Sequence, residues 1–143
     1  MIIPLSAGFE IFATTADLGI RAWGPTLPVL FQEAARGLFS LLIDGGRIAS
    51  REWVSVQAAG RNPETLLVAW LNELLFLFET RRFAAGAWKV SSLDEHGVVA
   101  EVGGEPLDLA RHRLVGQVKA ATYHELAIRQ TATGWDARVV LDV

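Results

Sequence analysis

The stretch "TTADLGIRAWGPTLPVLFQEAARGLFSLL", residues 14–42, contains the change of hydrophobic period that decides the fold. Apolar and non-apolar positions alternate from Leu18 to Trp23, which predicts a strand, and Gly24-Pro25 ends it. From Leu27 the apolar residues recur every three or four positions, which is the period of an amphipathic helix. Thr26 stands where an N-cap is expected. The stretch therefore predicts a strand followed directly by a helix.

A second strand and helix follow in the same order. Residues 52–58 alternate, with Val54 and Val56 on one side, which predicts a half-buried strand. The sequence "NPET", residues 62–65, supplies an Asn cap and a proline at the first helical position. The apolar residues of the predicted second helix are Leu66, Leu67, Trp70, Leu71, Leu74, Leu75 and Phe78. Their number indicates a helix buried on a wide face.

After Gly86 the pattern predicts strands to the end of the sequence. The expected strands are residues 88–93, 98–102, 118–122, 126–130 and 135–141. The short segments 95–97 and 132–134 are typical of hairpin turns, so the strands that they join should be antiparallel. Residues 103–116 form a longer irregular segment that could cross an end of the sheet.

These elements predict an α+β fold, in which two amphipathic helices pack on one face of a largely antiparallel mixed sheet, as a two-layer sandwich. The chain of 143 residues is long enough for one domain, residues 1–143, and too short for two. Hydrophobic residues make up 51% of the sequence and charged residues 20%, so a core can form and no segment is typical of disorder.

Charge and composition exclude several classes of protein. A formal net charge of −3 argues against strong direct binding of nucleic acid, which requires concentrated Lys and Arg. The absence of cysteine excludes disulfides and thiolate metal sites, and it fits a reducing cytoplasm. No apolar run approaches the roughly 20 residues of a membrane span, and the N-terminal residues lack the basic region of a signal peptide. We therefore expect a cytoplasmic protein without a membrane partner.

The sequence contains no phosphate-binding loop, no G-x-S-x-G elbow and no H-E-x-x-H zinc helix. The three histidines, His96, His112 and His124, do not have the spacing of metal ligands. An independent hydrolase is therefore poorly supported.

Two acidic positions and one polar segment are candidates for a site. Asp17 stands at the start of a predicted strand, where it either caps a turn or binds a ligand. Asp142 precedes Val143, and a free carboxylate on Val143 would place two anionic groups close together, as a hard cation such as Ca²⁺ or Mg²⁺ requires. The pattern by itself favours the simpler explanation, in which Asp142 belongs to a polar chain end. A solvated hairpin likewise explains the polar residues Lys119, His124 and Glu125 of "VKAATYHEL".

Taken together, these stretches resemble the archease family over essentially the whole chain. "TTADLGIRAWG" followed by "TLPVLFQEAARGLFSLL" resembles the opening of the family, "GEPLDLARH" with "VKAATYHEL" its late signature, and "ARVVLDV" its closing strand. The resemblance implies a small cytoplasmic accessory protein of the RtcB-type RNA ligase, which joins RNA ends in tRNA splicing and RNA repair with GTP and metal. Archease helps that ligase to become guanylylated and to turn over.

The resemblance also implies a metal site. Matched residue by residue, its ligands are Asp17, Asp142 and the terminal carboxylate of Val143, and the cation is Ca²⁺, Mg²⁺ or Mn²⁺. Lys119 matches the functional lysine of the late signature, and His124 and Glu125 lie beside it as further support for the partner or nucleotide site. Three converging carboxylates repel one another unless a metal or a lysine compensates their charge.

The sequence departs from the family pattern at Ala13 and Thr14, where an acidic residue and a histidine are usual. Thr14 can donate a hydrogen bond but cannot carry the positive charge of an imidazole. Two alternatives follow, namely a chaperone or interaction module with a different client and, less favoured, a stand-alone metal-dependent hydrolase. The sequence leaves open whether the chain forms a homo-oligomer.

Overall fold

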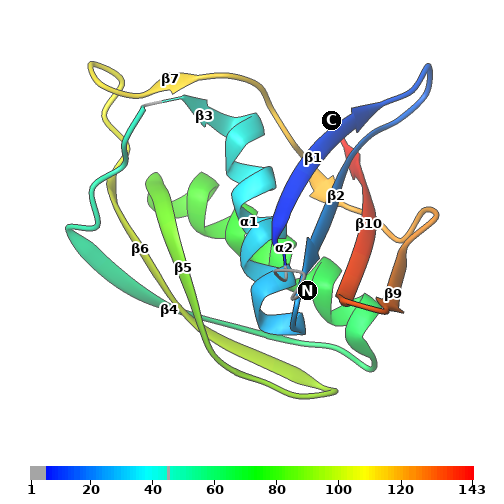
Figure 1. Cartoon of the computed structure of the whole chain (residues 1–143). Coiled ribbons are helices and arrows are strands. Elements are labelled where there is room, and N and C mark those ends of the chain that lie inside the picture. The colour runs from blue at the N-terminus through cyan, green and yellow to red at the C-terminus, as the bar shows by residue number, and fades with distance from the viewer. Residues whose placement is uncertain (1–5, 45) are drawn as a thin grey trace.

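The structure, a computed structural model, describes residues 6–44 and 46–143. It confirms the α+β class, with antiparallel pairing between all neighbouring strands of the described residues. The strands form three separate sheets rather than one continuous sheet (Figure 1). The two expected hairpin turns, at residues 95–97 and 132–134, each join a pair of antiparallel strands. The first joins β5 (Phe83–Leu93) to β6 (Gly97–Pro106), and the second joins β9 (Ala127–Thr131) to β10 (Gly134–Asp142).

The largest sheet has five strands and carries both ends of the described chain (Figure 1). Its order is β1 (Gly8–Ala13), β2 (Leu18–Gly24), β10 (Gly134–Asp142) and β8 (Ala120–Ala121), with β9 (Ala127–Thr131) also paired to β10. The three-stranded sheet has the order β4 (Glu52–Ala59), β6 (Gly97–Pro106) and β5 (Phe83–Leu93). The last sheet pairs β3 (Ile43–Asp44) with β7 (Arg113–Leu114).

Both helices begin where their caps are predicted. In α1 (Leu27–Leu42) the N-cap is Thr26, whose Oγ1 accepts a hydrogen bond from Val29 N at 3.4 Å. In α2 (Pro63–Arg81) the N-cap is Asn62, whose Oδ1 accepts from Thr65 N at 2.8 Å. These bonds satisfy backbone N–H groups that have no acceptor within the helix.

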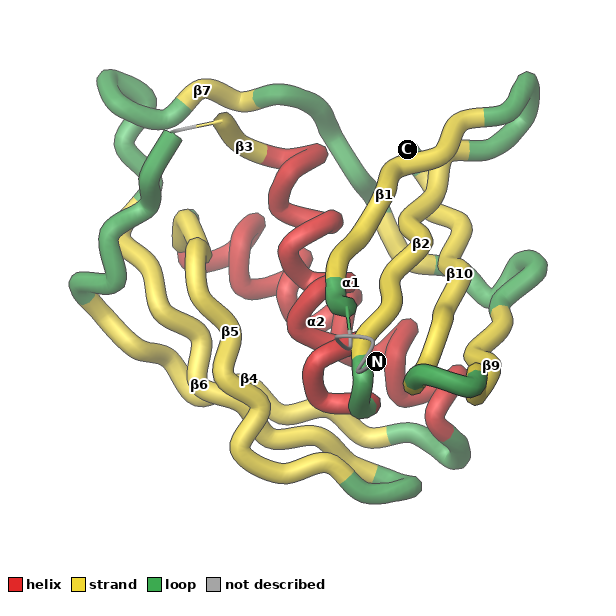
Figure 2. The backbone as a smooth tube through the Cα atoms, viewed as in Figure 1, coloured by secondary structure: helices red, strands yellow, loops and turns green. Residues whose placement is uncertain are grey.

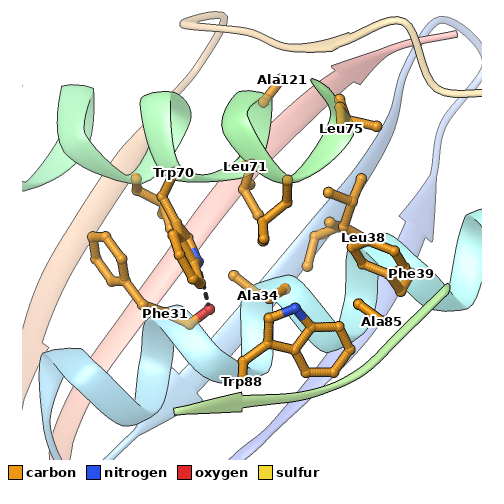
Figure 3. Packing of buried hydrophobic residues seen from close by; sticks show 14 of the residues in the cluster. Phe31, Ala34, Leu38, Phe39, Trp70, Leu71, Leu75, Ala85, Trp88 and Ala121 are labelled. Atoms are coloured by element: carbon orange, nitrogen blue, oxygen red, sulfur yellow. Dashed lines mark hydrogen bonds between the residues drawn. The ribbon is translucent and has the colours of Figure 1, made fainter. Parts of the chain in front are cut away.

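The core lies where the two helices meet the inner faces of the two larger sheets. Helix α1 contacts β2 of one sheet and β5 of the other, and α2 contacts β4 and β8 (Figure 2). Trp70 of α2 is fully buried and donates its indole N–H to the carbonyl oxygen of Phe31 in α1 at 3.0 Å (Figure 3). The ring centroid of Trp88 from β5 lies 5.4 Å from that of Phe39 in α1. This burial of the apolar helix faces is what the sequence pattern predicts.

The structure differs from the sequence pattern in several segments. Strands β3 and β7 pair with each other where the pattern predicts no strand. Strand β1 occupies residues 8–13, where the sequence pattern predicts no element. Strand β5 begins at Phe83 instead of residue 88, and the strand expected at residues 118–122 is reduced to the two residues of β8. Strand β6 continues past residue 102, its expected end, to Pro106. Gly103 and Gly104 allow this because Trp53 and Ala84 pack closely against them. A Cβ on Gly104 would lie 2.1 Å from the carbonyl oxygen of Ala84.

Within the described part of the chain, neither helix combines the length and the apolar character that crossing a bilayer requires.

Candidate functional site

The candidate site forms at one edge of the central strand β10. Strand β8 pairs with the last residues of β10 and β9 pairs with its first half, so both occupy the same edge one after the other. The turn that joins them, residues 122–126, therefore lies beside the middle of β10. Thr122 fastens this turn, because its backbone N–H and its hydroxyl both donate to the carbonyl oxygen of Val140, at 3.0 and 2.8 Å.

Helix α2 fixes β8 from its other side. The side-chain amide of Asn72 donates to the carbonyl oxygen of Ala121 at 3.3 Å and accepts from its N–H at 2.8 Å. These two bonds satisfy the backbone of Ala121 as a neighbouring strand would, which explains why the two-residue strand β8 is held in place. The turn after β8 thus starts from an anchored position.

Asp17 lies in the turn between β1 and β2. The Oγ1 of Thr14 accepts hydrogen bonds from Asp17 N at 2.9 Å and from Ala16 N at 3.4 Å, and Thr14 N donates to the carbonyl oxygen of Asp17 at 2.7 Å. Thr14, which stands where the family pattern has histidine, is therefore a turn-forming residue that presents Asp17. The side chain of Asp17 is half-buried and the backbone of the turn is exposed.

Asp17, His124 and Glu125 form one group, here called the surface cluster. One ligand atom from each of these residues lies within 4.8 Å of the other two. His124 Nε2 is 3.8 Å from Oδ2 of Asp17 and 4.0 Å from Oε1 of Glu125. Glu125 adopts a left-handed conformation, with φ of 50°, which non-glycine residues seldom adopt without tertiary constraint.

The expected C-terminal ligands lie next to this cluster but are not part of the group of three. Leu18 pairs with Leu141, so Asp17 and Asp142 are the next residues outward on neighbouring strands. Asp142 is exposed, and Val143 has 56% of its surface exposed. The topology thus brings Asp17 and the last residues to the same end of the sheet.

Lys119 lies beside Asp142 through the backbone, donating its N–H to the carbonyl oxygen of Asp142 at 2.7 Å. Its side chain is exposed. Among the described residues, its ammonium group has no carboxylate oxygen within 4.0 Å. In this structure Lys119 therefore does not act as the counter-charge of the surface cluster.

The donor set of the surface cluster fits a divalent cation. Two carboxylates and one imidazole offer oxygen and nitrogen ligands on an accessible surface. Carboxylate oxygens suit Mg²⁺, Ca²⁺ and Mn²⁺, and imidazole nitrogen extends the choice among transition metals. The residues that the structure brings together are thus suitable for the metal that the sequence resemblance implies.

A second group of charged and polar side chains, here called the buried cluster, is not evident from the sequence pattern. It consists of Glu105, Arg111 and His112. Glu105 and His112 are each 1% exposed. Glu105 accepts hydrogen bonds from Arg111 Nη2, from His112 Nε2 at 2.8 Å and from Ala49 N at 3.2 Å. The sequence signal is the spacing of "GEPLDLARH", in which the glutamate and the histidine are seven residues apart.

The hydrogen bonds of His112 determine its tautomer. Asp108 N donates to His112 Nδ1 at 2.9 Å, so this nitrogen carries no proton and Nε2 is the donor to Glu105. Burial by itself raises the pKa of Glu105, but the hydrogen bond of His112 and the charge of Arg111 outweigh it. The pKa of Glu105 is consequently lower than that of a free glutamate. Glu105 is therefore a satisfied structural carboxylate.

The fold and the surface cluster define a small α+β protein with a carboxylate and imidazole site at the edge of a five-stranded sheet. The family model of the archease protein family matches residues 9–143. The chain therefore belongs to the archease family.

Named relatives and one solved structure agree with this assignment. Protein archease of Methanosarcina acetivorans is 34% identical over 139 residues, with 94% of this chain and 95% of that protein covered. Protein archease of Pyrobaculum islandicum is 37% identical over 133 residues, with 90% of each covered. The solution structure of Methanobacterium thermoautotrophicum protein 1598 superposes with a TM-score of 0.81 at 32% identity, covering 95% of this chain and 99% of that one.

Proposed function

We propose that this protein is an accessory factor that promotes guanylylation and turnover of an RtcB-type RNA ligase in tRNA splicing or RNA repair. The observation that supports it most is the convergence of Asp17, from the turn between β1 and β2, with His124 and Glu125, from the last quarter of the chain. Membership of the archease family makes this ligase the expected partner.

In this proposal Asp17, His124 and Glu125 hold a divalent cation, and Asp142 with a terminal carboxylate of Val143 completes the ligand set from the adjacent strand. The bound cation would supply positive charge for phosphate oxygens at the ligase active site. The chain's own residues orient the ligands: Thr14 fixes the Asp17 turn and Thr122 fixes the turn of His124.

The surroundings of the cluster suit a protein partner better than a nucleic acid. His124 and Glu125 are exposed, as are Lys119 and Tyr123, the latter with 65% of its surface accessible. An exposed tyrosine beside charged groups is typical of protein interfaces. The net charge of −3 does not favour contact with phosphate backbones.

The test is a guanylylation assay with the RtcB-type ligase of the same organism, GTP and Mn²⁺ or Mg²⁺. The wild-type protein should raise both the guanylylated fraction of the ligase and its number of turnovers. Asp17→Asn and His124→Ala should abolish the stimulation, whereas Glu95→Gln, an exposed acid in the β5–β6 turn, should retain it. Stimulation by Asp17→Asn equal to that by the wild type would contradict the proposal.

A different client is the second candidate, and the presence of Thr14 in place of histidine favours it. The surface cluster then contains one imidazole, from His124, among the residues that the structure describes. A pull-down with the tagged protein separates the two candidates. Recovery of the ligase supports the first, and recovery of a single unrelated protein that binds the wild type but not Asp17→Asn supports the second.

A further inference from the structure

Arg138 of β10 connects the surface cluster to the outer face of the five-stranded sheet. Its Nη2 lies 3.1 Å from Oε2 of Glu125. The other carboxylate oxygen of Glu125, Oε1, lies 4.0 Å from His124 Nε2. The two oxygens of Glu125 therefore have different neighbours, one being held by the guanidinium and the other facing the imidazole.

The position of Arg138 is set by the sheet and not by the turn that carries Glu125. The guanidinium carbon lies 4.2 Å from the centroid of the Phe12 ring, which comes from β1. Phe12 can lie across the sheet because residue 19 is glycine: a Cβ at Gly19 would be 2.2 Å from Cζ of Phe12. A guanidinium on an aromatic ring is held by cation–π attraction and has less rotational freedom. Arg138 is therefore preorganised to hold Glu125.

Arg21 provides an internal comparison. It is paired with Arg138 in the register of β2 and β10, and it lies on the same face of the sheet. Its guanidinium binds Asp136 instead, with Nη2 at 2.9 Å and Nε at 3.2 Å from Oδ2, and Nη1 at 3.2 Å from Glu10. Arg21 thus has the same chemistry and a similar environment, but its ion pairs do not include a residue of the surface cluster.

Holding one oxygen of Glu125 affects which cation the cluster accepts. Ca²⁺ takes roughly six to eight oxygen ligands and commonly binds both oxygens of a carboxylate, whereas Mg²⁺ requires a near-octahedral shell with fewer protein ligands. Mn²⁺ accepts carboxylate oxygen together with imidazole nitrogen. We propose that Arg138 determines metal specificity by keeping Glu125 a monodentate ligand, which favours Mn²⁺ and Mg²⁺ over Ca²⁺. This inference rests on the metal site of the proposed function.

The test compares the dissociation constants for Ca²⁺ and Mn²⁺, because their ratio separates ligand geometry from charge. The positive charge of Arg138 repels both divalent cations alike, so its removal changes the two affinities together and cancels in the ratio. Mn²⁺ binding is measured from the electron paramagnetic resonance of free Mn²⁺, and Ca²⁺ by competition against it. The chain of 143 residues is used without the ligase.

In Arg138→Met we expect the ratio of the Ca²⁺ to the Mn²⁺ dissociation constant to fall about tenfold, within the range for residues that orient metal ligands. Phe12→Leu, which removes the ring under the guanidinium, should lower the ratio in the same direction by a smaller factor. Arg21→Met should leave the ratio at the wild-type value.

Circular dichroism and the melting temperature show whether each variant is folded, and Phe12→Leu carries the test if Arg138→Met is not. An unchanged ratio in a folded Arg138→Met overturns the specificity role and leaves the metal site standing. Failure of the wild-type protein to bind either cation overturns both the site and the role of Arg138.

Discussion

The buried cluster and the surface cluster each contain a glutamate beside a histidine, in opposite environments. Each has a glutamate that contacts a histidine and an arginine. In the buried cluster Glu105 and His112 are 1% exposed, and the His112 to Glu105 distance is 2.8 Å. In the surface cluster His124 and Glu125 are exposed, and the corresponding distance is 4.0 Å.

This difference shows that burial decides whether a glutamate beside a histidine has a structural role or can bind a ligand. A buried carboxylate must be fully hydrogen-bonded, so Glu105 has no oxygen left for a ligand and serves to join β6 to the segment that follows it. An exposed carboxylate is hydrated and can exchange water for a cation at little cost. His124 lies 3.8 to 4.0 Å from the carboxylate oxygens of Asp17 and Glu125, so its contact with them is weak. These groups therefore remain available to bind a cation.

The largest expected effect is on the buried cluster. Glu105→Ala should lower the melting temperature by roughly 10 °C, because it leaves the buried His112 Nε2–H without an acceptor and also removes the hydrogen bond of Ala49 N–H. Differential scanning calorimetry measures the change. The matched control is Glu95→Ala, an exposed glutamate whose loss should shift the melting temperature by no more than about 1 °C. Equal shifts for the two variants would remove the distinction between the clusters.

A smaller effect is expected in acid. A glutamate in an unfolded chain has a pKa of about 4.3, and the pKa of Glu105 is lower than this in the folded protein. The stabilising contribution of ionised Glu105 is therefore complete above pH of about 4.3 and is lost as the pH falls through the folded pKa.

Urea unfolding between about pH 3 and 6 measures this loss. Glu105→Gln keeps a side-chain acceptor but cannot titrate, so its free energy of unfolding should fall less steeply with decreasing pH than that of the wild type. Parallel curves for the two proteins would show that Glu105 has the same pKa in the folded and unfolded states.

The smallest effect concerns the turn that presents Asp17. Thr14→Val removes the Oγ1 that accepts from Asp17 N, and it should lower the free energy of unfolding by about 0.5 kcal/mol, since the bond is exposed to water. Thr15→Val, at the neighbouring exposed position, is the control. Mn²⁺ affinity should fall in Thr14→Val as well, because Asp17 is then held less firmly. A loss of stability without any loss of Mn²⁺ affinity would separate the turn from the site.

Local chemistry was sufficient to predict the helices, their caps and most of the strands. Thr26 and Asn62 cap the helices because their side-chain oxygens satisfy N–H groups a few residues away. The alternation before Gly24 and at residues 52–58 reflects which face of each strand is buried. These features depend on neighbours in sequence, so a single sequence contains enough information to predict them.

The misjudged segments depend on distant partners. Glu105 falls on the outward-facing positions of β6, and periodicity alone places it in solvent. It is buried because Ala49, Arg111 and His112 from two other segments cover it. Likewise, β8 is short because Asn72 of α2, and not another strand, pairs with Ala121.

The same division applies to the candidate site. The sequence by itself made Asp17, Asp142 with Val143, and the polar residues of 118–126 separate candidates, and the resemblance joined Asp17, Asp142 and Val143 into one metal site. Only the tertiary structure decided that His124 and Glu125 come nearest to Asp17, and that Arg138 and not Arg21 contacts Glu125. The reason is the order of strands around β10: sequence determines the character of each strand, but the edge on which β8 and β9 pair determines which side chains meet.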